Sequence, residues 1–366
     1  MRVATILGTR PEIIRLSLII GKLDVFAERH LLIHTGQNYT QSLSGIFFEQ
    51  LGLRKPDLQV VPSGRSLGMQ LSAMFRELEA ALERERPDVV LLLGDTNSAL
   101  SAVLVERMGI PVVHMEAGNR CYDLRVPEEK NRKIIDAVSS INMPYTAYSK
   151  ANLLREGFPA QRIVLTGNPI YEVMEHYRHR IDASDVIERL ALTPGDYLIV
   201  TAHRAENVDD PGRLAAILGG LNTVAERFGK RLICSVHPRT RSRLVRGGVK
   251  RPVHELVEFH EPFGFFDFVR LERHAWCAIT DSGTVQEECC IMRVPTVTIR
   301  ESTERPETVD CGSNAVCGLH PSRIAEAVAA MTALPAAWDV PEGYEARDVS
   351  DKVVKFLLGG KWDVQK

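Results

Sequence analysis

The 366-residue sequence has no long hydrophobic run and no excess of charge of either sign, and each absence excludes a class of protein. No apolar stretch approaches the roughly 20 residues that a membrane-spanning helix requires. Lysine and arginine number 45 against 47 for aspartate and glutamate, so no bulk field attracts a nucleic acid or an anionic membrane. The apolar run near the N-terminus is too short for a signal peptide, and Arg10 and Glu12 follow it at once. We therefore expect a cytoplasmic protein with no membrane or nucleic-acid partner.

The spacing of cysteine and glycine excludes two further kinds of site. The seven cysteines include the adjacent Cys289 and Cys290 but no C-x-x-C pair, which predicts reduced core thiols. No cysteine pair with the C-x2–4-C spacing of zinc ligands accompanies the 11 histidines, so we expect no metal site. The G-x-G-x-x-G fingerprint of dinucleotide binding is absent from the chain, and no cofactor is expected.

What the sequence does contain is an alternation of short apolar runs with amphipathic stretches. At 366 residues the chain is long enough for two domains. The alternation predicts an α/β protein with two parallel sheets and crossover helices. Strand candidates are residues 3–7, 31–34, 89–93, 112–115, 197–201, 232–236, 278–280 and 296–299, and helix candidates include residues 70–84, 129–138 and 213–227. Ligands of such sheets bind beyond the carboxyl ends of the strands, where the polar motifs described below begin.

A turn cluster at residues 167–169 predicts the domain boundary. We expect an N-terminal domain of residues 1–168 and a C-terminal domain of residues 169–348. The polar segment 341–348 is loop-like, and the helix candidate at residues 351–358 could pack on either domain.

Residues 281–288, DSGTVQEE, form the most informative segment of the chain. An apolar strand candidate leads into Ser282, Gly283 and Thr284, whose small side chains leave the start of a helix open to an anion. Glu288 lies one turn further on and could accept two hydroxyls of one sugar. A site for a phosphate next to a site for a sugar diol indicates that the segment binds a nucleotide. The alternative is that the segment is an ordinary capped helix with no ligand.

A group of carboxylates in the first half is suited to proton transfer. Asp95 and Glu116 each follow a strand candidate, and Glu128 lies in the first turn of a helix that Pro127 can begin. Chemistry that moves a proton on and off carbon needs carboxylates positioned in this way. The alternatives are a helix cap for Asp95 and a structural network of ion pairs for the group.

Cations and aromatic residues at other strand ends suggest contacts with a nucleotide. Arg10 and Arg15 follow the first strand candidate, and guanidinium groups suit phosphate oxygens, although both could be ordinary surface residues. His203, with Arg204 beside it, favours phosphate contact over the structural role usual for a lone histidine. Residues 236–239 and the aromatic run 263–268 could stack on a base, while core packing competes for most of the four phenylalanines. Arg305 is a further cation after a strand candidate.

Seven of these motifs occur in one order, and together they identify a family. They are residues 8–12 (GTRPE), 94–96 (GDT), 116–118 (EAG), 127–132 (PEEKNR), 203–207 (HRAEN), 281–288 (DSGTVQEE) and 303–307 (TERPE). Over essentially its full length the chain resembles the bacterial non-hydrolysing UDP-N-acetylglucosamine 2-epimerases. The resemblance implies a GT-B fold, with two Rossmann-like domains facing across a cleft and a C-terminal helix, about residues 349–366, that crosses back to the first domain. It also implies a cytoplasmic homodimer that makes precursors of surface polysaccharide.

The resemblance implies a mechanism and a role for each candidate residue. UDP and the C2 proton leave to give a glycal, and proton return from the other face with re-addition of UDP inverts C2 without a redox cofactor. Which carboxylate removes the proton and which returns it stays open. The implied roles are acid/base catalysis for Asp95, Glu116 and Glu128, diphosphate stabilisation for His203, Arg10 and Arg15, phosphate binding for Ser282, Gly283 and Thr284, ribose binding for Glu288, uracil contact for Phe268 and completion of the site for Arg305.

Several departures from the family pattern bear on the substrate. Arg15 replaces the lysine of many members, Thr284 replaces a glycine, and residues 36–39 lack the Gln-His-Arg of members with a second, activating substrate site. Residues 116–123, EAGNRCYD, resemble the branch that acts on modified amino sugars, including UDP-2,3-diacetamido-glucuronate and the UDP-N-acetyl-L-fucosamine pathway. There Arg120 and Arg125 could bind a hexuronate carboxylate, or pair with Asp123 and Glu129.

The competing functions are a hydrolysing 2-epimerase, a GT-B glycosyltransferase and a UDP-sugar binding protein.

Overall fold

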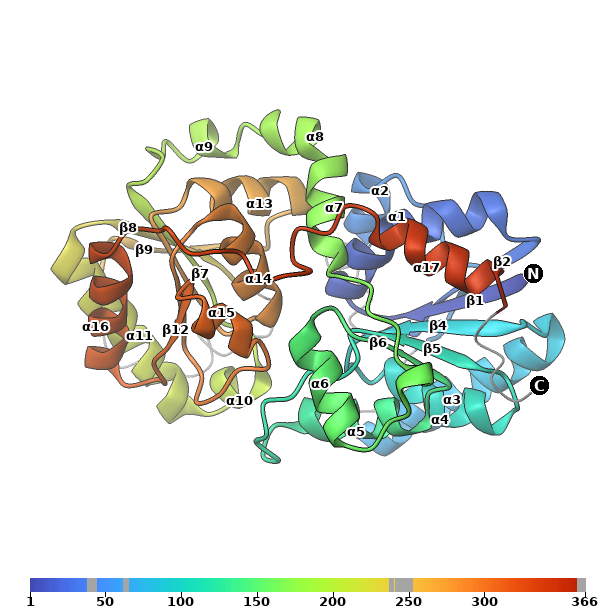
Figure 1. Ribbon diagram of the computed structural model, residues 1–366. Helices are drawn as coiled ribbons and strands as arrows, with labels where there is room; N and C mark the ends of the chain where they lie inside the picture. The colour runs from blue at the N-terminus through green and yellow to red at the C-terminus, as the bar shows by residue number, and fades with distance from the viewer. Residues whose placement is uncertain (38–44, 62–65, 237–239, 241–252, 361–366) are drawn as a thin grey trace. The chain divides into compact units, whose positions relative to one another are not determined.

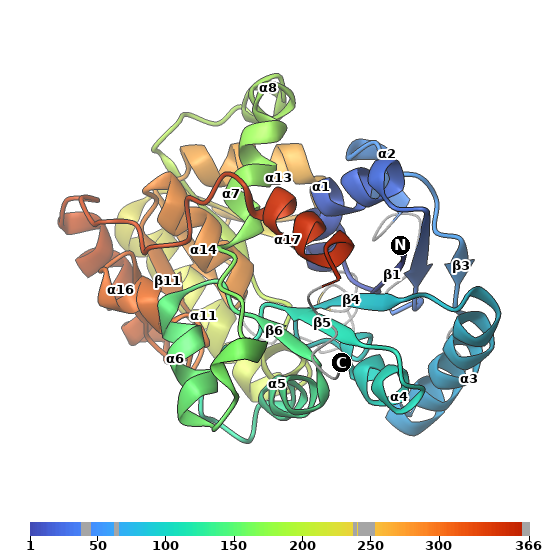
Figure 2. The same ribbon diagram turned by 45° about the vertical axis from the view of Figure 1, so that its right-hand side comes forward.

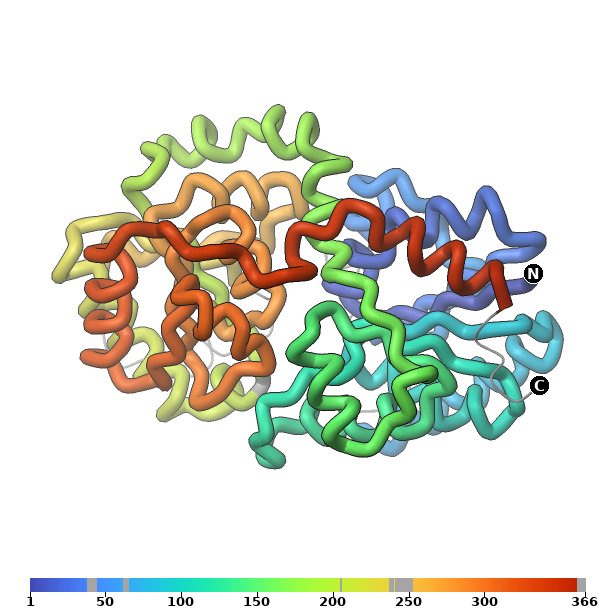
Figure 3. The backbone as a smooth tube through the Cα atoms, viewed as in Figure 1, coloured from blue at the N-terminus to red at the C-terminus, as the bar shows by residue number. Residues whose placement is uncertain are grey.

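The structure, a computed structural model, describes residues 1–37, 45–61, 66–236, 240 and 253–360. The chain forms two compact units, of which unit 1 comprises Met1–Glu175 and Glu342–Lys366 and unit 2 comprises His176–Pro341 (Figure 1). The backbone trace in Figure 3 follows the chain from unit 1 through unit 2 and back to unit 1 at its C-terminal helix. Among the helices that the structure describes, none has the length and apolar character needed to cross a membrane.

Unit 1 is built on a parallel six-stranded sheet of order β3-β2-β1-β4-β5-β6. Its central strands are continuous apolar runs because helices cover both faces of a parallel sheet. The strands are β1 (Arg2–Leu7), β2 (Arg29–His34), β3 (Leu58–Gln59), β4 (Val89–Leu93), β5 (Val112–Met115) and β6 (Ile141–Met143). The helices are α1 (Arg10–Phe26), α2 (Ile46–Gln50), α3 (Leu67–Glu85), α4 (Ala102–Arg107), α5 (Pro127–Val138), α6 (Ala147–Arg155), α7 (Pro169–His176), which ends at the first residue of unit 2, and α17 (Val349–Leu358), with short 3-10 turns at Ala99–Ser101 and Ala160–Arg162.

The helices of unit 1 lie on two faces of its sheet. Figures 1 and 2 both show α3, α4 and α5 on one face and α1 with α17 on the other. Met74, Leu78 and Leu82 of α3 pack in one apolar cluster with buried residues of β1, β2 and β4. The C-terminal helix α17 is tied to α1 by Lys22, whose Nζ lies 2.6 Å from Asp351 Oδ1. The carboxyl edge of the sheet is left to the loops that carry the polar motifs.

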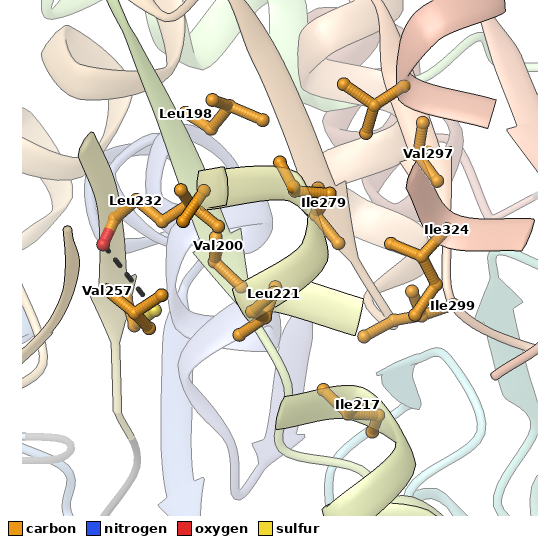
Figure 4. Packing of buried hydrophobic residues seen from close by; sticks show 14 of the residues in the cluster. Leu198, Val200, Ile217, Leu221, Leu232, Val257, Ile279, Val297, Ile299 and Ile324 are labelled. Atoms are coloured by element: carbon orange, nitrogen blue, oxygen red, sulfur yellow. Dashed lines mark hydrogen bonds between the residues drawn. The ribbon is translucent and has the colours of Figure 1, made fainter. Parts of the chain in front are cut away.

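Unit 2 repeats the architecture with a parallel sheet of order β12-β11-β10-β7-β8-β9. A large core cluster lies between this sheet and the helices α11 and α16, where Ile217 and Ile324 meet the strands (Figure 4). Two parallel sheets with connecting helices confirm the predicted α/β class. The strands are β7 (Tyr197–Thr201), β8 (Arg231–Ser235), β9 (Val257–His260), β10 (Cys277–Thr280), β11 (Thr296–Thr298) and β12 (Asn314–Val316). The helices are α8 (Arg178–Asp182), α9 (Val186–Arg189), α10 (Ala205–Val208), α11 (Pro211–Phe228), α13 (Phe265–His274), α14 (Gly283–Met292), α15 (Pro306–Asp310) and α16 (Pro321–Ala333).

Candidate active site

Two candidate acid/base carboxylates follow neighbouring strands of unit 1. Leu93 of β4 pairs with Met115 of β5, so Asp95 and Glu116 leave the same edge of the sheet. Glu116 has a φ of 67°, a left-handed conformation that costs a non-glycine residue about 1 kcal/mol or more. Strain of this kind is retained where the surrounding structure fixes it, and it is concentrated at functional sites. The strained backbone therefore supports a functional role for Glu116, in which the orientation of its side chain is fixed.

The Glu116 carboxylate is held by a buried arginine. Arg15 donates from Nη1 to Glu116 Oε2, and the two side chains are only 2% and 9% exposed. The Arg15 guanidinium also lies 5.8 Å from the centre of the Tyr145 ring, a cation–π distance. Arg10, the first residue of α1, lies 5.7 Å from the Phe47 ring centre. The diphosphate role of both arginines stays a prediction, and for Arg15 the structure adds contact with a candidate acid/base group.

Helix α5, which carries the third candidate carboxylate, Glu128, contacts Asp95 through two other side chains. Arg132 lies within 2.8 Å of Asp95 Oδ2 through both Nε and Nη2, and Asn131 Nδ2 donates to the Asp95 carbonyl at 2.8 Å. Glu128 lies three and four residues before these two side chains and so shares their face of the helix. Arg132 also pairs with Glu129 at 2.8 Å. Asp95 and Glu116 therefore lie at the carboxyl ends of β4 and β5, next to the helix that carries Glu128, and the acid/base role of Glu128 stays a prediction.

A buried carboxylate that sequence analysis did not single out, Glu12, connects two of these loops. Its Oε2 accepts hydrogen bonds from the backbone N–H of Gly8 at 3.0 Å and of Thr9 at 2.6 Å, and from the Thr9 hydroxyl. Its Oε1 accepts from the hydroxyl of Thr96, the neighbour of Asp95, at 2.9 Å. Burial raises the pKa of Glu12 from 4.5 to about 7, although these hydrogen bonds act in the opposite direction. The T-x-x-E capping-box pattern at residues 9–12 was the available sequence signal.

Glu12 is expected to make the stability of the protein depend on pH. Because its pKa is higher folded than unfolded, the folded state is relatively favoured below pH 4.5 and loses that advantage as the pH rises toward 7. Glu12→Gln preserves the shape, accepts from the backbone with its oxygen and donates to Thr96 with its amide. Between pH 5 and pH 8, the free energy of unfolding should fall by about 2 kcal/mol more in the wild type than in this variant. Urea unfolding at both pH values measures the difference, with Glu83→Gln on the exposed surface of α3 as the control; equal losses in wild type and Glu12→Gln would contradict the assignment.

In unit 2 the buried Asp281 organises the loop that carries His203. Its carboxylate accepts from the backbone N–H groups of His203 and Arg204, both at 3.0 Å, and from Asn207 Nδ2 at 3.1 Å. The His203 ring stays 39% exposed, with Nδ1 3.4 Å from Asp281 Oδ1. The loop after β7 is thereby fixed beside the start of α14, with the His203 ring partly exposed at the carboxyl edge of the sheet.

The start of α14 lies against a buried network of charges. Ser282 is the residue before the helix, and a Cβ added to Gly283 would lie 2.7 Å from Glu304 Oε1, so glycine allows the close approach. Arg305 donates from Nε to Glu287 at 2.5 Å. Glu304 in turn pairs with Arg300 at 2.7 Å and Arg204 at 3.1 Å. Thr284 is half-buried and Glu288 is buried on α14, so the predicted phosphate and ribose contacts start from one ordered helix.

The aromatic run packs in the core of unit 2. Phe268 is 9% exposed and lies in a cluster with Ile199 of β7 and Val285 of α14, and Phe265 and Phe266 are also buried. Core packing is therefore confirmed for these three residues, and contact of Phe268 with uracil stays a prediction. Of the segment 236–239, residues 237–239 lie outside the described residues.

The two arginines proposed for a sugar carboxylate have different environments. Arg120 is 1% exposed and binds Asp136 at 2.8 Å and Glu156 through two hydrogen bonds of 2.8 and 2.6 Å. The expected pairing of Arg120 with Asp123 and Glu129 is wrong, because the fold gives it Asp136 and Glu156 instead. Contact of Arg120 with a hexuronate carboxylate stays a prediction. Arg125 is exposed and forms the expected pair with Asp123 at 2.8 Å.

Comparisons with known proteins agree with these motifs. The family described as UDP-N-acetylglucosamine 2-epimerase matches residues 25–358. A UDP-N-acetylglucosamine 2-epimerase of Methanocaldococcus jannaschii is 38% identical over 99% of this chain and 100% of its own length. A UDP-2,3-diacetamido-2,3-dideoxy-D-glucuronate 2-epimerase of Pseudomonas aeruginosa is 34% identical over 98% of this chain and 99% of its own. The structure of the M. jannaschii 2-epimerase in complex with UDP-GlcNAc and UDP aligns with a TM-score of 0.93 at 37% identity, covering 98% of this chain and 100% of that one.

Proposed function

This chain belongs to the UDP-N-acetylglucosamine 2-epimerase family, and from that membership we propose that it interconverts UDP-N-acetylglucosamine and UDP-N-acetylmannosamine. It is an epimerase with the GT-B fold, as its two parallel sheets and its structural relatives establish. The observation that carries the proposal is the placement of Asp95 and Glu116 at adjacent strand ends, each bound by an arginine. Such fixed carboxylates suit proton transfer at carbon.

The proposed reaction has two halves that run through one intermediate. The C1–O bond breaks and UDP leaves with the bonding electrons, while a carboxylate takes the proton from C2, which gives a glycal. A carboxylate then delivers a proton to the opposite face of C2 as UDP adds back to C1. Atoms and electrons balance without an oxidant or reductant. We assign the proton transfers to Asp95, Glu116 and Glu128.

Unit 2 is proposed to bind the UDP group. The N-terminus of α14 offers backbone N–H groups and the positive end of a helix dipole to phosphate. His203 of unit 2, with Arg10 and Arg15 of unit 1, would stabilise the diphosphate that develops charge as C1–O breaks, where one preorganised contact is worth about 3 kcal/mol. Glu288 would accept the ribose hydroxyls. Phe268 would border the uracil, and Arg305 would support the helix start through Glu287.

The unmodified amino sugar is the better-supported substrate. The M. jannaschii structure contains UDP-GlcNAc, whereas the P. aeruginosa relative is named for a diacetamido-glucuronate. A glucuronate would need a cation for its C6 carboxylate, and Arg120 is already bound to two buried or half-buried carboxylates. A cytoplasmic location and a homodimer are proposed on the family resemblance.

Proton NMR of the protein with UDP-N-acetylglucosamine in deuterium oxide, with no added cofactor, tests the proposal. We expect deuterium at C2, a UDP-N-acetylmannosamine anomeric signal and no free sugar. Release of free N-acetylmannosamine would instead identify a hydrolysing enzyme. If neither UDP-N-acetylglucosamine nor the diacetamido-glucuronate and 6-deoxy relatives exchange the C2 proton, epimerisation is excluded, and a glycosyltransferase or a UDP-sugar binding protein takes its place.

A further inference from the structure

A buried histidine in unit 1, His114, contacts the backbone carbonyl next to Asp95 and the side chain of Asp136. His114, on β5, is 1% exposed. Its Nε2 lies 2.8 Å from the carbonyl oxygen of Gly94, the residue before Asp95. Its Nδ1 lies 2.9 Å from Asp136 Oδ1 on α5. The ring therefore joins the end of β4 to α5 at the place where Asp95 begins.

The second oxygen of Asp136 extends the connection to the loop after Glu116. Asp136 Oδ2 accepts from the backbone N–H of Gly118 at 3.1 Å and pairs with Arg120 at 2.8 Å. His114 and Asp136 thus hold the residue before Asp95 and the residue two positions after Glu116. Removing either side chain frees one of these two backbone contacts.

The partners of His114 define its protonation. A carbonyl oxygen only accepts hydrogen bonds, so Nε2 must carry a proton. Independently of His114, Asp136 accepts the Gly118 N–H and pairs with the Arg120 guanidinium through Oδ2, and both contacts favour its ionised form. An ionised Asp136 also only accepts, so Nδ1 must carry a proton as well. The charged groups around the ring are Asp136 and, behind it, Arg120 and Glu156; with a protonated His114 their charges sum to zero.

We propose that His114 is an imidazolium that acts as a positioning residue for Asp95 and Glu116, an inference that rests on the proposed epimerase function. Its charge-assisted hydrogen bond to the Gly94 carbonyl fixes the peptide that leads into Asp95, where Gly94 has a φ of 76°. Through Asp136 it also fixes the turn after the strained Glu116. Small displacements of catalytic groups have large effects on rate, which is why such backbone contacts matter.

Nitrogen-15 NMR of protein labelled at histidine tests the protonation directly. We expect both ring nitrogens of His114 to have imidazolium shifts at neutral pH, each with a bonded, slowly exchanging proton. The spectrum of His114→Asn assigns the signals. A ring nitrogen in the unprotonated range would overturn the proposal. This measurement needs no substrate, so it decides the protonation even if no UDP-sugar is turned over and the proposed function fails.

Two variants of similar shape distinguish a positioning role of His114 from a role in core packing alone. An asparagine amide lies near the Nδ1 position and keeps the bond to Asp136, whereas a glutamine amide lies near Nε2 and keeps the bond to Gly94. We expect His114→Asn to lower kcat about tenfold to hundredfold with KM within about twofold of wild type, and His114→Gln to recover most of the loss. His30→Asn is the matched control, because His30 is also buried between an aspartate, Asp24, and a hydroxyl. Full activity of His114→Asn, or no recovery by glutamine, would overturn the positioning role.

Discussion

Glu116→Gln and Asp95→Asn are each expected to lower kcat by about 10²- to 10⁴-fold, the range that positioned acids and bases contribute. Each amide keeps the shape of its carboxyl group but cannot take or deliver a proton at C2. The two variants differ in their structural cost. Glu116 is the buried partner of Arg15, whereas Asp95 is 22% exposed beside Arg132. Asp95→Asn is therefore the cleaner test of chemistry.

The measurement combines turnover with the affinity for UDP. Initial rates of C2 deuterium exchange give kcat, and calorimetry with UDP reports binding, which we assign to unit 2 and expect to be retained. Asp123→Asn is the matched control, because Asp123 pairs with an exposed arginine in the same segment and has no assigned role. Near-normal exchange by both amide variants would disprove the assignment of Asp95 and Glu116, and loss of exchange by Asp123→Asn would show that the segment, and not these two groups, is sensitive.

The sequence predicted the centre of each sheet and missed the edges. The eight predicted strands correspond to the four inner strands of each sheet, β1, β2, β4 and β5 in unit 1 and β7, β8, β10 and β11 in unit 2. The strands without a prediction, β3, β6, β9 and β12, are the edge strands. An inner strand of a parallel sheet is buried on both faces and so forms an apolar run. An edge strand is short and, except for β6, partly exposed here, which leaves no such run to recognise.

Candidate site residues could be found by sequence motif, but their partners could not. Glu116 follows a strand and was identifiable, yet Arg15, which binds it, lies 101 residues away in the sequence. Asp281 was visible in the DSGTVQEE motif, but its acceptance of the His203 and Arg204 N–H groups depends on the pairing of β7 with β10. The partners of long charged side chains depend on which residues the tertiary fold brings close, and the spacing of residues along the sequence does not reveal this. Motifs therefore located the groups, and the fold assigned their contacts.

The partners of Arg120 were likewise not predictable from the sequence. Its substitution has the largest expected effect on stability. Arg120→Met should lower the free energy of unfolding by about 3–5 kcal/mol, because removing one partner of a buried ion pair leaves the other charge uncompensated. Without Arg120, the fully buried Asp136 and the partly exposed Glu156 share the single positive charge assigned to His114, so one negative charge is left uncompensated. Methionine retains most of the apolar stem, so lost packing contributes little to this cost. Urea unfolding followed by circular dichroism measures the change.

Arg125→Met is the matched control for this variant, because Arg125 lies in the same segment but pairs with Asp123 at the surface. A surface pair contributes little to stability, so this change should leave the urea midpoint nearly unchanged. The comparison also separates the two roles open for Arg120. If Arg120 served a sugar carboxylate, Arg120→Met would fold as stably as Arg125→Met and would lose affinity only for a glucuronate substrate. A large loss of stability without substrate present instead assigns Arg120 to the scaffold that supports Asp136 and, through it, the loops of Asp95 and Glu116.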